Sequence, residues 1–137
     1  MASTVAFKLI TPLQVVFEGD AELIIAVTTE GEEGILPHHA PFLAALKPGV
    51  LRANVVRDGS TQRLELATSE GFMQALPDGV TILVDEARAF DDIDVAKTRE
   101  ELAQAQERRA ATSDRLGLAR EQAAIDFAAA KLRLTGH

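Results

Sequence analysis

The chain has 137 residues and a formal net charge of −7, with 47 % hydrophobic and 26 % charged residues, as in ordinary globular proteins. The acidic balance argues against free nucleic acid as a partner. No cysteine is present, which excludes a disulfide framework, a thiolate zinc site and a cysteine nucleophile. No apolar run approaches the roughly 20 residues of a membrane-spanning helix, and we see no secretory signal or transit peptide.

Hydrophobic periodicity changes at Phe90. Up to that residue the chain carries 6 Lys and Arg against 12 Asp and Glu, and beyond it 8 against 9. In the first part, apolar and polar residues alternate over residues 5–10 and 63–67, which is typical of half-buried strands. Short β-branched runs at 23–27 and 81–84 indicate buried strands. Residues 1–90 are therefore predicted to form a β-sandwich.

Three dipeptides mark turns between these strands. Asp58-Gly59 and Asp78-Gly79 are hairpin signals, because glycine supplies the positive φ that tight turns require. Pro48-Gly49 marks another turn.

A cluster of carboxylates, Asp91, Asp92 and Asp94, opens the second part of the chain, where side chains of this type cap a helix. From Ile93 to about Ala111 there is no Gly or Pro, and strong helix formers dominate. We predict a first helix there.

Residues 112–114 (Thr-Ser-Asp) supply a break and a new cap, and a second helix is predicted to end near Thr135-Gly136. Residues 91–137 are thus expected to form an antiparallel two-helix hairpin. Alanine occupies eleven positions after Phe90, and Leu102 is the only large apolar residue between Val95 and Leu116. Such a thin seam buries little apolar area, so the hairpin should be held weakly.

Residues 29–46 contain several acidic and histidine side chains close together in sequence. Carboxylates and imidazoles of this kind can bind a metal ion or act as an acid–base pair. Pro37 and Pro41 exclude a helix that would bring them together, and adjacent histidines in an extended segment point apart. We therefore predict no metal and no catalytic residue, but a turn-rich loop that contacts a protein. The residues concerned are Glu30, Glu32, Glu33, His38 and His39.

The chain contains no phosphate-binding GxxxxGK[ST], no GxSxG and no HExxH pattern, so no sequence motif supports a hydrolytic enzyme. A basic cluster of Arg108, Arg109 and Arg115 surrounds the turn between the predicted helices. Its ordinary interpretation is a solvated helix end, and its alternative is a docking site for an acidic surface of a partner.

Five motifs in this order resemble the epsilon subunit of bacterial F-type ATP synthases, and the resemblance covers nearly the whole chain. They are residues 31–37 (GEEGILP), 39–41 (HAP), 46–49 (LKPG), 70–72 (EGF) and 80–85 (VTILVD). The hairpin is similar in length and place to the C-terminal domain of that family.

The resemblance implies a β-sandwich of about ten strands followed by the hairpin, and a non-catalytic subunit of the central stalk. It implies partners in the gamma subunit and the c-ring, through which alone the chain would meet the membrane. In many members the hairpin lifts and obstructs ATP hydrolysis at the alpha and beta subunits of the catalytic head. With no transit peptide, we expect a peripheral location at the cytoplasmic face of a bacterial inner membrane.

The family pattern assigns Glu30, Glu32, His38 and His39 to the end of the sandwich that faces the c-ring, and makes Arg108, Arg109 and Arg115 candidates for contact with the head. Two departures stand out: His38 and Glu70 occupy positions where the family commonly has glycine. The geometry of the loop around His38 is therefore an open question.

Some members bind ATP through an Ile/Leu-Asp-x-x-Arg-Ala motif that opens the first C-terminal helix. Here that position holds Ile93-Asp94-Val95-Ala96-Lys97-Thr98, in which lysine cannot reproduce the guanidinium fork. The similar Val84-Asp85-Glu86-Ala87-Arg88-Ala89 lies one segment early, at the end of the last predicted strand. We expect no cofactor, and weak or absent ATP binding. The alternative to a stalk subunit is a free-standing nucleotide-sensing or interaction module.

Overall fold

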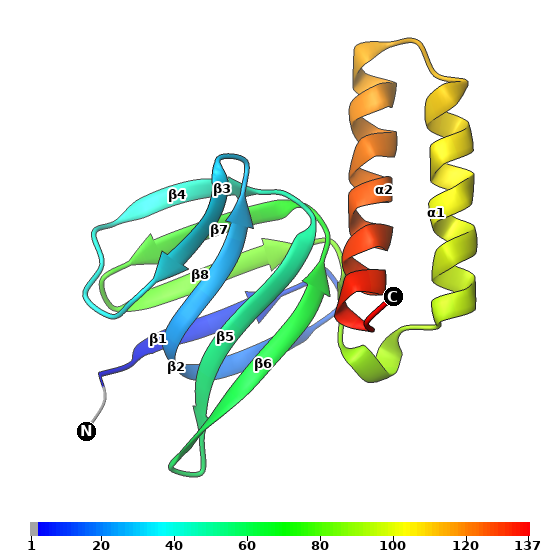
Figure 1. Ribbon diagram of the computed structural model, residues 1–137. Coiled ribbons are helices and arrows are strands. Elements are labelled where there is room, and N and C mark those ends of the chain that lie inside the picture. Colours follow the sequence, from blue (N-terminus) through cyan, green and yellow to red (C-terminus); the bar gives the residue numbers. More distant parts are fainter. Residues whose placement is uncertain (1–2) are drawn as a thin grey trace.

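The computed structural model describes residues 3–137 as a strand-rich domain followed by two long helices (Figure 1). The strands are β1 (Val5–Ile10), β2 (Val15–Thr28), β3 (Gly31–Ile35), β4 (Phe42–Leu46), β5 (Gly49–Arg57), β6 (Ser60–Thr68), β7 (Gly71–Leu76), β8 (Gly79–Val84) and β9 (Ala87–Arg88). A single 3-10 turn, η1 (Phe90–Asp92), leads to α1 (Val95–Ala110) and α2 (Arg115–Leu134).

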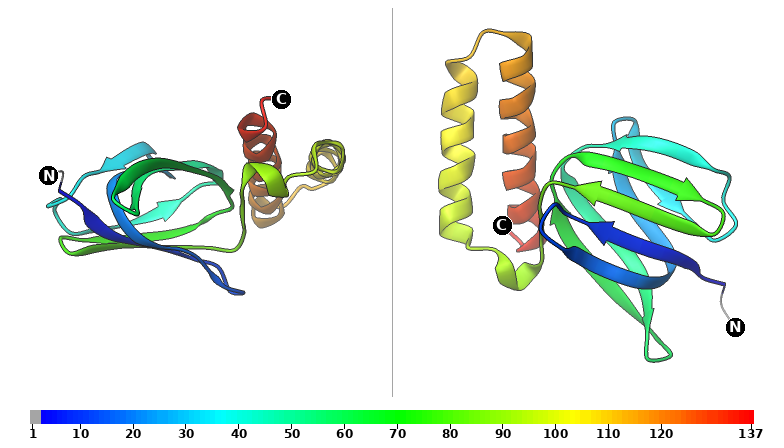
Figure 2. Two further views of the ribbon diagram at one scale, coloured as in Figure 1. Left: turned by 90° about the horizontal axis from the view of Figure 1, so that it is seen from below. Right: turned by 180° about the vertical axis from the view of Figure 1, so that it is seen from behind.

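The strands form one hydrogen-bonded sheet that folds back on itself into two layers, seen in the left panel of Figure 2. The long strand β2 joins the layers, because it pairs with β1 through its first half and with β3 and β5 through its second half. One layer holds β1, β8, β7 and β4; the other holds β3, β2, β5, β6 and β9. The β-sandwich prediction is confirmed, with nine strands in the described residues in place of about ten.

The core of the sandwich follows the predicted alternation. Val5, Phe7 and Leu9 are all buried, as are Ile82 on β8 and Met73 on β7. Every buried member of this core cluster lies between residues 5 and 84. The sandwich therefore buries its own apolar face without any contribution from the helices.

The two predicted hairpin turns have different outcomes. Asp58 (φ 51°) and Gly59 (φ 79°) form the two-residue turn between β5 and β6, as predicted. The prediction for Asp78-Gly79 was wrong by one residue: Leu76 pairs with Gly79, so Pro77 and Asp78 make the turn. Gly79 is a strand residue because its pairing with β1 and β7 holds it in the sheet.

Each helix begins at the aspartate nearest its first turn. Asp94 accepts a hydrogen bond from the Lys97 amide at 3.0 Å, and Asp114 accepts one from the Gly117 amide at 2.8 Å. Asp91 and Asp92 lie in η1 and do not cap α1, which begins two residues later than predicted.

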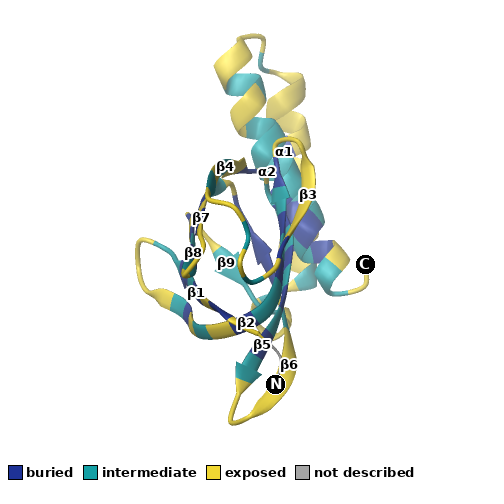
Figure 3. Cartoon of the chain, turned by 90° about the vertical axis from the view of Figure 1, so that its left-hand side faces the viewer, coloured by how far each residue is buried: buried dark blue, intermediate teal, exposed yellow. Residues whose placement is uncertain are grey.

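Only a small apolar cluster joins the hairpin to the sandwich. Phe127 and Ala130 of α2 pack against Ala67 of β6, and Val50 and Leu134 cover the edge. Figure 3 shows that the far half of the hairpin is mostly exposed. The two helices run side by side, and α2 is the helix beside the sandwich in every view (Figures 1 and 2).

Candidate functional site

An apolar face covers the outside of the layer β1–β8–β7–β4. Phe72 on β7 lies directly opposite Leu83 on β8, and their side chains are 60 % and 50 % exposed. Leu43 on β4 (73 % exposed) and Leu76 on β7 extend this patch along the same face. We call these four residues, Leu43, Phe72, Leu76 and Leu83, the apolar face.

Close strand pairing brings these side chains together. A Cβ at Gly71 would lie 1.9 Å from the carbonyl oxygen of Leu83, so only glycine permits this approach of β7 to β8. Phe72 and Leu83 consequently form a cross-strand pair on the outer surface.

The apolar face is also almost free of charge. The outward positions of its four strands carry one charged residue, Lys8, whose ammonium lies 3.9 Å from Glu18, and no acidic residue. In a chain with a net charge of −7 this is a marked depletion. Contiguous exposed apolar surface without charge is typical of the core of a protein–protein interface.

Sequence reasoning missed the apolar face. The signal was present in β7 and β8, where both alternating sets of positions contain large apolar residues. Ile82 and Val84 are buried while Leu83 between them is exposed. A sandwich strand normally has one solvated face, so an apolar residue in each set indicates a second covered surface.

The segment predicted as a turn-rich loop, residues 29–46, contains the two strands β3 and β4. Residues 31–35 form β3, which pairs with β2 despite two glycines and two glutamates. Tertiary pairing here overrides a weak local strand propensity. Within residues 3–137, β3 pairs only with β2, so its other edge is open.

The four residues assigned to the c-ring lie along this open edge. Glu30 is in the turn between β2 and β3. Its amide donates a hydrogen bond to the hydroxyl of Thr28, the last residue of β2, at 3.1 Å. Glu32 is exposed on β3 and forms an ion pair with Arg52 of β5. His38 and His39 follow β3 at its other end, so the set spans a strand of five residues, about 16 Å, in place of one loop tip.

The two histidines differ in environment. His38 is exposed, whereas His39 is half-buried, with its Nδ1 donating to the Leu36 carbonyl at 2.9 Å and its ring edge against Phe42. No group of three His, Asp or Glu side chains in residues 3–137 is arranged to hold a metal ion.

The loop question at His38 has a clear answer. His38 adopts φ 66°, the left-handed region that glycine occupies without strain. The loop therefore keeps a glycine-like backbone with a histidine in place.

We expect His38→Val to lower the free energy of unfolding, because a β-branched side chain is more crowded in this region than the histidine already there. His38→Gly should be at least as stable as the natural chain. Urea denaturation of both variants measures this, and an unchanged midpoint for His38→Val would contradict it.

The basic cluster lies at the far tip of the hairpin. Arg109 and Arg115 are exposed and have no ion-pair partner within residues 3–137. Arg108 is different, because its Nε donates to both carboxylate oxygens of Glu121 on α2, at 2.9 and 3.1 Å. Of the three arginines, Arg108 alone has an ion-pair partner among the described residues.

The residues of the altered nucleotide motif do not converge on a cavity. Asp94 is occupied as the cap of α1, Lys97 is exposed and Ile93 is half-buried. A groove of about 380 Å³ lies between the sandwich and the hairpin, and none of the three lines it. Asp85 and Glu86 of the similar upstream segment do line it, but Ala87 and Arg88 there form the short strand β9.

Comparison with known proteins identifies the family. Residues 4–89 match the ATP synthase, Delta/Epsilon chain, beta-sandwich domain. The ATP synthase epsilon chain of Syntrophobacter fumaroxidans is 39 % identical over 134 residues, covering 98 % of this chain and 97 % of that one. The chain belongs to the ATP synthase epsilon chain family. The epsilon chain of Halalkalibacterium halodurans is 40 % identical, over 96 % of this chain and 90 % of that one.

Solved structures share the fold over nearly the whole chain. A chain of the Euglena gracilis mitochondrial ATP synthase, in a structure of OSCP, F1 and the c-ring, gives a TM-score of 0.77 at 22 % identity, covering 98 % of this chain and 82 % of that one. A chain from the central stalk and c-ring structure of the Tetrahymena thermophila mitochondrial ATP synthase gives 0.62 at 17 % identity, covering 97 % of each.

Family membership decides two predictions. The identification from sequence motifs is confirmed, and an epsilon chain is a non-catalytic subunit of the synthase.

Neither helix in the described residues is long and apolar enough to cross a membrane.

Proposed function

We propose that this protein is a rotor subunit of the central stalk, which binds the gamma subunit and the c-ring and turns with them at the cytoplasmic face of a bacterial inner membrane. The observation that carries the proposal is the apolar face. Four large apolar side chains lie exposed on the outer side of β4, β7 and β8, whose outward positions hold no charged residue, and they are suited to burial against another subunit.

We assign the apolar face to gamma. A stalk subunit that transmits torque needs a firm contact, and burial of apolar surface is the dominant favourable term in most protein–protein association. The open edge of β3 is assigned to the c-ring, because its exposed Glu30 and Glu32 suit the polar surface of a loop.

We propose that the hairpin is a regulatory arm that limits ATP hydrolysis through contact of Arg108, Arg109 and Arg115 with an acidic surface of the catalytic head, formed by alpha and beta subunits. Its support is the small contact with the sandwich and the exposed tip that carries the arginines. ATP binding by this subunit is expected to be weak or absent, because Asp94 is used as a helix cap and Lys97 stands apart from the groove.

The orientation is tested by cross-linking. The chain has no natural cysteine, so Glu32→Cys places a single thiol on β3. Loss of the exposed ion pair with Arg52 should cost less than about 1 kcal/mol. In the assembled synthase we expect a cross-link to a polar loop of the c-ring subunit.

The matched control is Ser60→Cys, at the tip of the β5–β6 turn, which lies far from β3 in Figure 1. It should not cross-link to the ring. Efficient cross-linking of the cysteine at position 32 to a catalytic subunit would contradict the proposed orientation.

A further inference from the structure

Two ion pairs link the helices of the hairpin, one near each end. Arg108 of α1 binds Glu121 of α2 near the tip, and Lys131 of α2 binds Glu101 of α1 at 3.0 Å near the base. Between them the seam is closed by small residues such as Ala105, which is 1 % exposed. Because alanine buries little apolar area, the two ion pairs add to a thin seam in holding the helices together.

The pair at the tip is unequal in burial. The Glu121 side chain is 14 % exposed, whereas the Arg108 side chain is 53 % exposed. A carboxylate that is largely removed from water needs a charged partner, and Arg108 is the partner it has. The guanidinium is still reachable from solvent on its outer side.

We propose that Glu121 acts as an internal competitor for Arg108 and latches the closed hairpin. Glu121 holds the Nε–H of Arg108 and neutralises its charge, so an external acidic surface has only the Nη groups of a neutralised guanidinium to bind, and it binds Arg108 more tightly once the pair opens. This inference rests on the proposed regulatory role of the hairpin. It assigns opposite roles to two residues in direct contact: Arg108 promotes inhibition of hydrolysis and Glu121 opposes it.

The opposite signs distinguish this latch from an ordinary structural ion pair. Both Arg108→Ala and Glu121→Gln break the pair and loosen the seam. Only Glu121→Gln keeps the guanidinium and removes the negative charge that competes for it. If the pair were merely structural, the two variants would change hydrolysis in the same direction.

The experiment uses the full chain, alone and in the assembled synthase. Charge-assisted hydrogen bonds are about twice as strong as neutral ones, so Glu121→Gln weakens the contact that holds α1 against α2. Because amide hydrogens of α1 exchange when the helix opens, their exchange should become roughly fivefold faster. In the synthase, Glu121→Gln should strengthen inhibition of hydrolysis, and Arg108→Ala should weaken it.

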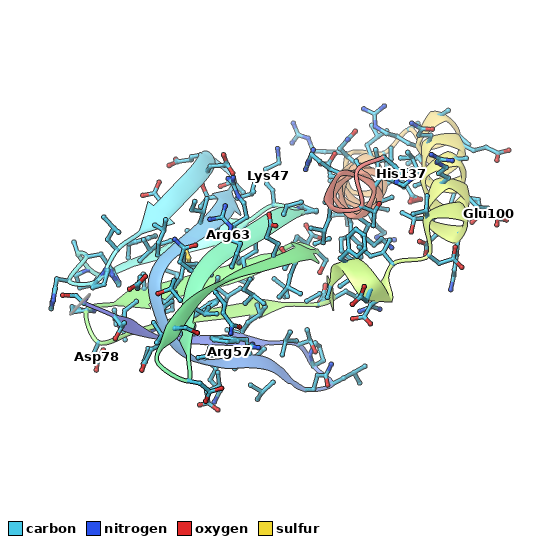
Figure 4. The ribbon with its side chains drawn as sticks, turned by 60° about the horizontal axis from the view of Figure 1, so that its bottom comes forward. Lys47, Arg57, Arg63, Asp78, Glu100 and His137 are labelled. Atoms are coloured by element: carbon cyan, nitrogen blue, oxygen red, sulfur yellow. The ribbon has the colours of Figure 1, made fainter. Side chains whose placement is uncertain are left out.

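The control is Glu100→Gln, which removes the same charge from a residue that points away from α2 in Figure 4. It should leave both measurements unchanged. High salt should speed exchange of α1 in the natural chain and have less effect in Glu121→Gln.

Unchanged exchange of α1 in Glu121→Gln would overturn the latch itself. Faster exchange with unchanged hydrolysis would overturn the competition, whereas the regulatory role of the hairpin is overturned only if truncation of the hairpin also leaves hydrolysis unchanged. Faster exchange with weaker inhibition would overturn the competition alone.

Discussion

A chain that ends at Asp92 is expected to fold, to join gamma and the c-ring, and to support ATP synthesis. All buried members of the sandwich core lie within residues 5–84, so none is lost. The truncation exposes the patch around Ala67 that Phe127 and Ala130 cover. Burial of one Phe contributes about 1.5 to 3 kcal/mol, which sets the scale of the stability change.

The effect on hydrolysis should be large. If the hairpin limits hydrolysis, its removal should raise the ATPase rate of the assembled enzyme by about fivefold or more, which is the lower end of ordinary coupling between sites. ATP synthesis by inverted membrane vesicles should be unchanged. The measurements are urea unfolding of the truncated chain, and hydrolysis and synthesis by synthase carrying either form.

Arg108, Arg109 and Arg115 replaced together by Ala should mimic the truncation in hydrolysis. A truncated chain that cannot fold or cannot assemble would contradict the division into a sandwich and a regulatory arm. Hydrolysis that does not respond to either change would show that this hairpin does not inhibit.

Phe72→Glu is expected to prevent stable assembly of the subunit with gamma. Aromatic side chains at the centre of an interface commonly contribute 2 kcal/mol or more, and a buried unpaired carboxylate adds a further penalty. We expect the affinity to fall at least about a hundredfold, or roughly 2.7 kcal/mol. Co-purification with tagged gamma, followed by titration of the pair, measures the loss.

The isolated variant should unfold at the same urea concentration as the natural chain, because Phe72 is 60 % exposed and lies outside the core. The matched control is Gln62→Glu, an exposed position on β6 in the other layer, which should bind gamma normally. Normal assembly of Phe72→Glu would remove the apolar face from the proposed interface.

The sequence by itself determined the features that depend on near neighbours along the chain. The alternation of Val5, Phe7 and Leu9 identifies β1 and its buried side. Asp58-Gly59 defines a turn because both residues accept positive φ. Asp114 identifies the start of α2 because its carboxylate satisfies a free amide three residues on, whereas the three aspartates before α1 predicted a start two residues too early. The motifs identify the family for a similar reason, because each motif and their order along the chain can be read without knowing which residues are in contact.

Only the tertiary structure decided the features that depend on residues far apart in sequence. Residues 31–35 become a strand because β2 offers hydrogen-bond partners, and Gly79 becomes a strand residue through β1. Phe72 and Leu83 are eleven positions apart and form one surface only when β7 pairs with β8.

The hairpin shows the same division most clearly. Both helices are predictable from composition and caps, since helix formation is local. The pairing of Arg108 with Glu121 is not, because they are thirteen positions apart on different helices, and long-range packing sets how the helices face each other. Local hydrogen bonding fixes which segments are helix or strand, but long-range packing fixes which side chains meet, and the proposed interactions of this protein depend on those meetings.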